Sequence, residues 1–161
     1  MTTQIRQALP QDAIAIARIA NALIRDTLVT FTTQERLPEE ISAKLREAAT
    51  PFLVAEIEEY VVGFATYGPF RNGPGYTHTQ EHSIQLSPAA QGRGLGRALM
   101  QRLEKEARAN GVHTLVAGIS SANPKAVAFH GAIGFSKSGH MAQVGRKWDQ
   151  WLDLILMQKQ L

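Results

Sequence analysis

The sequence predicts an α/β fold in three layers, with helices flanking a mixed central β-sheet. The main observation is the order of the segments, since strand-like and helical patterns follow one another as β-α-α-β-β-β-α-β-α-β-β. The chain also lacks repeats, low-complexity tracts and linker-like stretches. We therefore expect its 161 residues, 1–161, to form a single domain with a sizeable core.

The N-terminal half provides the first six elements. Pro10 and Pro38 open helices, because proline is tolerated in the first helical turn. The turn 58–60 joins two apolar segments into a hairpin, and the Gly/Pro-rich stretch 68–75 predicts an irregular loop. In chain order we expect a strand at 3–8, a helix at 13–26, a loop at 27–37, a helix from 38 to near 49, and strands at 52–57, 61–67 and 79–87.

The C-terminal half is organised around the helix that follows a glycine-rich turn, 91–96. Leu95, Leu99, Leu103 and Ala107 recur every four residues and mark one face of this helix, which Asn110-Gly111 ends. The elements expected after it are a strand at 114–119, a short helix at 125–133, and strands at 136–144 and 151–158.

A strand, a glycine turn and a helix N-terminus together predict an anion site, because unpaired backbone N–H groups and the helix dipole meet there. A P-loop is excluded, since no Lys-Ser or Lys-Thr follows the glycines. A dinucleotide loop is also excluded. The spacing is G-x-G-x-G, and no acidic residue occurs from Ala107 to Trp148.

Gln91-Gly92-Arg93-Gly94-Leu95-Gly96 instead matches [QR]-x-x-G-x-[GA] at every specified position. This is the pyrophosphate-loop pattern of the GNAT superfamily of N-acetyltransferases, which the chain resembles over nearly its full length. The stretch from Asn123 through His130 to Gly134-Phe135 is similar to the N-x6-[YH]-x3-G-F signature of that superfamily. The resemblance implies the acyl-CoA N-acyltransferase fold.

Within the superfamily, the chain is most similar to the phosphinothricin and methionine-sulfoximine N-acetyltransferases. The residues that carry this narrower resemblance are Phe70-Arg71, Tyr76, 79–83, His130 and 144–153. Two positions depart from the group. Gly73 stands where a second arginine, which helps to hold the substrate carboxylate, is common, and Gln85 stands where an aromatic residue is usual.

The resemblance implies that acetyl-CoA is the cosubstrate and that no metal takes part. Its pyrophosphate is expected on the amides from Gly92 to Arg97, and its pantetheine arm along the end of the preceding strand. The expected cofactor-binding residues are Ile84, Gln85, Leu86, Gly92, Arg93, Gly94, Leu95, Gly96, Arg97 and Asn123. The backbone N–H of Leu86 is the expected donor to the thioester oxygen.

Acetyl transfer to an amine also requires a base. Glu81 is the best candidate, because it lies in the strand that leads to the glycine turn and partial burial raises a carboxyl pKa. His130 is the expected general acid or second base. By resemblance, Arg71 and Tyr76 contact the amino acid substrate together with Glu81, and an arginine suits bidentate binding of its carboxylate. Three of these residues also have an alternative interpretation without a role in catalysis. Glu81 would then be an exposed strand carboxylate, His130 a structural histidine and Arg71 an exposed arginine.

The composition excludes several other functions. The chain has no cysteine, so disulfides, thiolate metal sites and a cysteine thioester intermediate are ruled out. His78-Thr79-Gln80-Glu81-His82 reads as H-x-x-E-H, but that zinc motif requires a helix and this stretch is strand-like. No apolar run approaches the ~20 residues of a membrane span. The N-terminus lacks a signal region, and we expect a cytoplasmic protein with no membrane partner.

The formal net charge is +3, but the basic residues concentrate in one region. Residues 91–147 contain nine lysines and arginines against two glutamates. Nucleic-acid binding would call for a basic run or basic residues interleaved with aromatics, and neither occurs. A compact polyanion such as coenzyme A is the better match for this charge.

These observations lead us to expect an acetyl-CoA-dependent N-acetyltransferase that acts directly on the α-amine of a small amino acid or analogue. One alternative is the same fold acting on a protein N-terminus or a polyamine. The other is a coenzyme-A-binding module without catalysis. The resembling enzymes are generally homodimers, so a homodimer is expected, and the Trp148–Trp151 stretch is a candidate for core, substrate wall or dimer contact.

Overall fold

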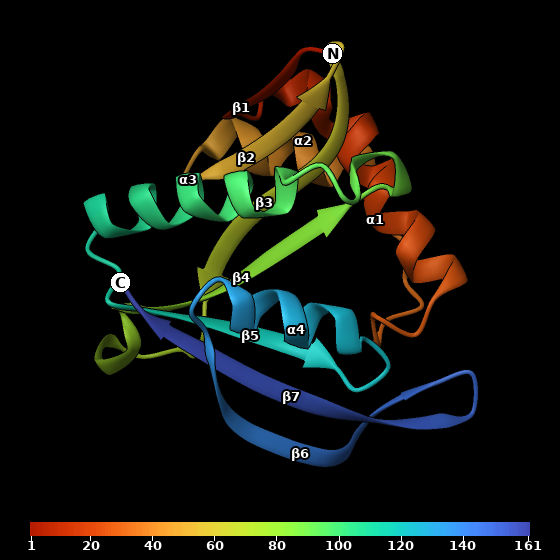
Figure 1. Cartoon of the computed structure of the whole chain (residues 1–161), viewed down its shortest axis with the longest axis vertical. Coiled ribbons are helices and arrows are strands. Elements are labelled where there is room, and N and C mark those ends of the chain that lie inside the picture. The colour runs from red at the N-terminus through yellow and green to blue at the C-terminus, as the bar shows by residue number, and fades with distance from the viewer. The chain divides into compact units, whose positions relative to one another are not determined.

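The computed structural model describes residues 1–161 and contains a mixed seven-stranded sheet with four α-helices (Figure 1). The strand order in the sheet is β1-β2-β3-β4-β5-β7-β6. All neighbouring pairs with a defined register are antiparallel except β4 and β5, which run parallel. The mixed sheet and the order of the elements are those that the sequence predicted.

The chain divides into two compact units. Unit 1 comprises 1–21, 36–68 and 82–111, and unit 2 comprises 22–35, 69–81 and 112–161. The elements are β1 (Thr3–Gln7), α1 (Ala13–Asp26), α2 (Pro38–Glu47), β2 (Phe52–Ile57), β3 (Tyr60–Pro69), β4 (Thr79–Leu86), α3 (Leu95–Ala109), β5 (Thr114–Ser120), α4 (Pro124–Ala132), β6 (Ser136–Lys147) and β7 (Gln150–Gln160). No helix is long and apolar enough to cross a membrane.

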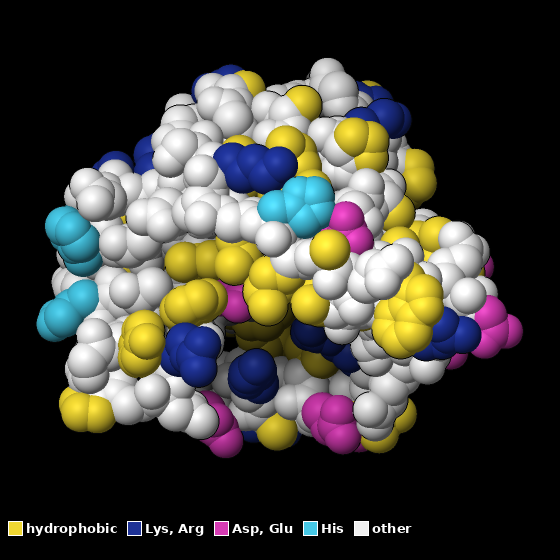
Figure 2. Space-filling model, turned by 90° about the horizontal axis from the view of Figure 1, so that it is seen from below, with side chains coloured by type: hydrophobic (Ala, Val, Ile, Leu, Met, Phe, Trp, Pro, Cys, Tyr) yellow, Lys and Arg dark blue, Asp and Glu magenta, His cyan; other side chains and the backbone are white.

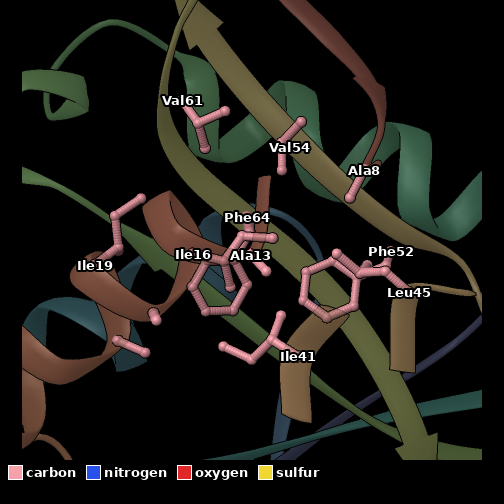
Figure 3. Packing of buried hydrophobic residues seen from close by; sticks show 12 residues of the cluster. Ala8, Ala13, Ile16, Ile19, Ile41, Leu45, Phe52, Val54, Val61 and Phe64 are labelled. Atoms are coloured by element: carbon pink, nitrogen blue, oxygen red, sulfur yellow. The ribbon is translucent and has the colours of Figure 1, made fainter. Parts of the chain in front are cut away.

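Unit 1 is built on the hairpin of β2 and β3. Figure 3 shows the cluster in which α1 and α2 pack against these strands, with the rings of Phe52 and Phe64 stacked at a centroid distance of 5.7 Å. Helix α3 also contacts β1 and β2. Its predicted face is buried, since Leu95, Leu99, Leu103 and Ala107 are at most 5% exposed. The packed face therefore fixes the position of the glycine turn at the start of α3.

Unit 2 is built on β5, which pairs with the first residues of β4 on one side and with β7 on the other. Helix α4 contacts β5 and β6. β6 and β7 form a long hairpin in which β6 is bulged between Met141 and Gly145. β5 therefore has a neighbouring strand on each side within unit 2.

Several local boundaries differ from the sequence prediction, most of them by one or two residues. β3 runs on to Pro69, and residues 74–76 form a single 3-10 turn within the expected loop. β6 continues to Lys147, because the turn to β7 consists only of Trp148 and Asp149, both with positive φ. Such two-residue turns normally contain asparagine or glycine, so the local residue pattern did not indicate a turn here.

Candidate functional site

The glycine turn of unit 1 presents unpaired backbone donors. Gly92 and Gly94 have φ of 72° and 74°, a conformation that glycine adopts at no steric cost. Gly94 is the N-cap residue of α3 and has no side chain with which to cap the helix. The N–H groups of the first helical turn, Leu95 to Arg97, therefore have no partner within the helix, and no acidic side chain lies in this turn. This geometry suits a phosphate group.

The two arginines of the turn differ in their surroundings. Arg93 Nε donates to the carbonyl oxygen of Ala89 at 3.0 Å, and its Nη1 lies 3.0 Å from Met1 Sδ. Arg97 is exposed in the first turn of α3. Arg93 thus stabilises the loop itself, while Arg97 adds positive charge at the helix N-terminus.

The end of β4, also in unit 1, holds the three residues that we expected along the pantetheine arm. Ile84, Gln85 and Leu86 are half-buried. Leu86 Cδ2 covers Gly63, where a Cβ would collide with it. Gln85 Oε1 and the nearby Ser87 Oγ are buried and have no hydrogen-bond partner. Buried polar atoms without partners are uncommon, and these two suit a ligand that brings its own polar groups.

Glu81 lies in the part of β4 that belongs to unit 2, paired with Val116 of β5. Its side chain extends over Gly118, where a Cβ would lie 2.8 Å from Oε2. Glu81 is accessible to solvent, but burial of its carboxyl group against the protein raises its pKa above the ordinary value of 4.5. A carboxyl group with a raised pKa that solvent can still reach is suited to accept a proton near neutral pH.

His130 lies in the last turn of α4 and is 4% exposed. Its Nδ1 lies 2.7 Å from the carbonyl oxygen of Ala126, and the rings of Phe129 and Phe135 contact it edge-on. Burial lowers the pKa of His130 below 6.5, although the bond to Ala126 acts in the opposite direction. Burial thus favours the neutral ring, and in that form Nδ1 carries the proton, because only a donor can bond a carbonyl oxygen.

Asn123 caps α4, since its side chain accepts a hydrogen bond from the N–H of Ala126 at 3.2 Å. Pro124 then occupies the first position of the helix, where its missing N–H is not needed. Asn123 therefore has a structural role as the cap of α4. Asn123 also links α4 to β5, because its own N–H donates to the carbonyl oxygen of Ser120 at 2.9 Å.

Arg71 and Tyr76 come together in the loop before β4. The Arg71 guanidinium carbon lies 5.9 Å from the centroid of the Tyr76 ring, and Phe70 packs edge-on against the same ring. Gly73, where the resembling enzymes commonly have arginine, has a φ of 108°. Residues other than glycine rarely adopt this angle, so an arginine at this position would strain the backbone.

A sequence model of the Acetyltransferase (GNAT) family matches residues 16–135. The chain belongs to this family. It is a GNAT N-acetyltransferase, and its sheet and helices have the fold of that family.

Three relatives of this acetyltransferase are informative. An L-methionine sulfoximine/L-methionine sulfone acetyltransferase of Salmonella typhimurium is 41% identical over 98% of this chain and 94% of its own length. The phosphinothricin acetyltransferase of Sinorhizobium meliloti, solved in complex with acetyl-CoA, is 33% identical with a TM-score of 0.92, over 100% of this chain and 89% of its own. A ribosomal-protein-alanine N-acetyltransferase of Brucella melitensis is 40% identical with a TM-score of 0.93, and the match covers 98% of this chain and 99% of its own length.

One residue of this acetyltransferase with a direct effect on the candidate base was not selected from the sequence. Gly118 leaves room for the Glu81 carboxylate, and a larger residue would displace it. The available signal was a glycine inside the apolar strand 114–120, which often marks a close approach of another group.

Replacement of Gly94 tests the glycine turn. No atom lies within 4 Å of the position that a Cβ would occupy, so Gly94→Ala should act only through its positive φ. That strain is about 1–2 kcal/mol, so the affinity for coenzyme A should fall about tenfold. Isothermal titration calorimetry with coenzyme A is the measurement. Gly68→Ala, where space is equally open and φ is not positive, is the control, and unchanged affinity in Gly94→Ala would contradict the role of the turn.

Proposed function

We propose that this acetyltransferase moves the acetyl group of acetyl-CoA to the α-amine of a small amino acid or amino acid analogue. The analogues are of the methionine sulfoximine, methionine sulfone or phosphinothricin type. The observation that carries the proposal is the 41% identity, over 98% of this chain, to an enzyme with that activity on the first two compounds. Further support comes from a phosphinothricin N-acetyltransferase of Streptomyces viridochromogenes, 33% identical over 97% of this chain and 86% of its own length.

Most of the residues assigned to the cosubstrate lie in unit 1. The amides of Gly92, Gly94, Gly96 and their neighbours Arg93, Leu95 and Arg97 bind the pyrophosphate, and Ile84 to Leu86 line the pantetheine arm. The unpaired acceptors Gln85 Oε1 and Ser87 Oγ support this assignment, since the amide groups of pantetheine carry N–H donors. Asn123 is assigned a second role, a contact to the same arm, in addition to its capping role.

The acceptor amine is assigned to residues of unit 2. Arg71 binds the carboxylate of the amino acid, and Tyr76, which packs against Arg71, lines the same subsite. Glu81 removes one proton from the ammonium group, so that the amine nitrogen carries the lone pair that attacks the thioester carbonyl carbon. The N–H of Leu86 donates to the developing oxyanion, a contribution of about 3 kcal/mol in comparable sites.

His130 is assigned the role of second base. The attacking nitrogen still carries two protons when the C–N bond has formed, and one must leave. Nε2 of the neutral ring can accept that proton, because Nδ1 donates to Ala126. When the C–S bond breaks, the imidazolium can return the proton to the departing sulfur. We therefore favour the second-base assignment, since burial disfavours an imidazolium at the start of the reaction.

A second candidate function is acetylation of a protein N-terminus. It is favoured by the 40% identity to the ribosomal-protein-alanine N-acetyltransferase and by Gly73, which removes an arginine that would hold a free carboxylate. A peptide N-terminal residue has no such carboxylate. The two candidates therefore differ in the group that must lie beside the amine.

An assay of thiol release from acetyl-CoA against a panel of amines tests the proposal. The panel contains methionine sulfoximine, methionine sulfone, phosphinothricin, spermidine and a short peptide that begins with alanine. We expect turnover with the three amino acid analogues and at most weak turnover with the other amines. Activity confined to the peptide would support the second candidate, and activity confined to spermidine would contradict both.

Replacement of Glu81 tests its role as the base. Glu81→Gln should lower turnover by about 10²-fold or more at neutral pH while it leaves the affinity for coenzyme A unchanged. The wild-type rate should fall as pH decreases through the raised pKa of Glu81, at a pH above 4.5, because the protonated carboxyl cannot accept a proton. Steady-state rates across pH are the measurement, and the variant should lack this acidic limb.

Two further variants sharpen this test. Gly118→Ala keeps the carboxylate but displaces it, so it should lower turnover while it preserves an acidic limb. Glu59→Gln, in the exposed turn between β2 and β3, is the control and should behave as wild type. An unchanged rate in Glu81→Gln would remove Glu81 from the mechanism.

We assign a second copy of the chain as the partner that covers the exposed hydrophobic side chains of the β6–β7 hairpin. Four hydrophobic side chains of the β6–β7 hairpin, Met141, Val144, Trp148 and Trp151, are 47–56% exposed. Figure 2 shows exposed hydrophobic side chains between basic and acidic ones on one face of the molecule. Sedimentation equilibrium should give twice the mass of one 17.6 kDa chain, and Trp151→Glu should shift it to monomer. A wild-type monomer would contradict the homodimer.

A further inference from the structure

Unit 2 contains a lysine that is buried without a carboxylate partner among its hydrogen bonds. Lys147, at the end of β6, is 2% exposed. Its Nζ donates to the carbonyl oxygen of Ile24 at 2.8 Å, to that of Thr27 at 2.7 Å and to Thr30 Oγ1 at 2.9 Å. An ammonium group has three N–H donors, so all three are used by one stretch of chain.

Burial of a charged ammonium group is unfavourable unless hydrogen bonds replace its water. Burial accordingly disfavours the charged form of Lys147 and lowers its pKa below the ordinary value. The three acceptors in turn depend on Lys147, because Ile24 lies in the last turn of α1 and the other two lie in the irregular segment after it. The conformation of residues 27–31, hereafter the 27–31 segment, therefore depends in part on this side chain.

The 27–31 segment crosses one face of the strands of unit 2. Ser120 Oγ, at the end of β5, donates to the carbonyl oxygen of Leu28 at 2.7 Å. Phe31 covers Gly145 of β6, where a Cβ would lie 2.5 Å from its ring. Ser120 and Gly145 are opposite Leu154 and Leu152 of β7, two residues that point to the same side. Contacts from β5 and β6 thus place the segment on one side of this sheet.

The Glu81 carboxylate lies on that same side. It covers Gly118, whose Cβ position is also 3.5 Å from Leu154 Cδ1. Gly118 and Ser120 are two residues apart on β5, so their side chains share a face and are separated by about 6.5 Å along the strand. The 27–31 segment, held over Ser120, therefore borders the Glu81 carboxylate.

We propose that Lys147 is a positioning residue that holds the 27–31 segment as the wall of the acceptor-amine subsite beside Glu81. This proposal rests on the proposed function, in which Glu81 removes a proton from the acceptor amine. Leu28, Val29 and Phe31 are half-buried, so the wall is largely apolar. It suits the aliphatic part of an amino acid side chain, and it has no direct role toward acetyl-CoA.

The test separates the two substrates kinetically. Lys147→Met keeps the length of the chain but removes three donors, and it should raise the KM for methionine sulfone at least tenfold while the KM for acetyl-CoA changes less than twofold. Thr30→Val removes one acceptor and should raise the KM for methionine sulfone about threefold to tenfold. Thr30→Ser keeps the hydroxyl and should restore most of that affinity. Lys137→Met, an exposed lysine of the same strand, is the control.

A second readout does not depend on activity. Release of the 27–31 segment should expose Phe31 to chymotrypsin, so Lys147→Met and Thr30→Val should be cleaved there at least fivefold faster than Lys137→Met, as measured by mass spectrometry. If Lys147→Met does not fold, the two Thr30 variants decide the question. An unchanged KM for the amine, or equal changes in both KM values, would overturn the proposal.

A failure of the proposed function and a failure of the role of Lys147 would give different results. Wild-type enzyme that acetylates none of the amines would contradict the proposed function and, with it, the assignment of the segment to an acceptor subsite. Cleavage at Phe31 would still report whether Lys147 holds the segment. Equal cleavage rates in all variants would show that it does not, whatever the substrate is.

Discussion

The pairing of β5 on both of its edges is the constraint on which unit 2 depends. β5 is parallel to β4 on one side and antiparallel to β7 on the other, so its backbone is fixed in both directions. Its residues then set the positions of three groups. Gly118 lies under the Glu81 carboxylate, Ser120 binds the 27–31 segment, and the chain that leaves β5 enters α4 through the cap at Asn123. The positions of the candidate base, of the 27–31 segment and of the helix that carries His130 thus all depend on this one strand.

The fold of this acetyltransferase could be predicted in large part from local sequence signals. The face of α3 follows a four-residue repeat that needs no tertiary information, and α1 begins and ends at the residues expected from its pattern. The largest error arose where the usual turn residues are absent. Trp148 and Asp149 adopt a conformation normally filled by Asn-Gly, and two contacts accompany it. The Lys147 ammonium lies 4.7 Å from the Trp148 ring centroid, and Arg146 lies 3.5 Å from Asp149.

The candidate site divides in the same way. The glycine turn could be located from the sequence, because its function depends on backbone amides and a short local pattern. The residues that surround each side chain of the site could not be predicted from the sequence. Lys147 and its acceptor Ile24 are 123 residues apart, and nothing in either local sequence indicates the contact. The tautomer of His130 likewise follows from one hydrogen bond to Ala126 that only the coordinates reveal. Residue types indicate which chemistry is possible, whereas the pKa and the proton position depend on the surroundings.

The backbone at Gly73 has an evolutionary consequence. With a φ of 108°, this position excludes an arginine unless the loop around it changes its course. A single codon change to arginine would therefore not recreate the pair of cations common among the resembling enzymes, because the new side chain would first have to reshape the loop. A second cation at this position would accordingly require coupled substitutions or an insertion in the loop, and not the exchange of one side chain alone.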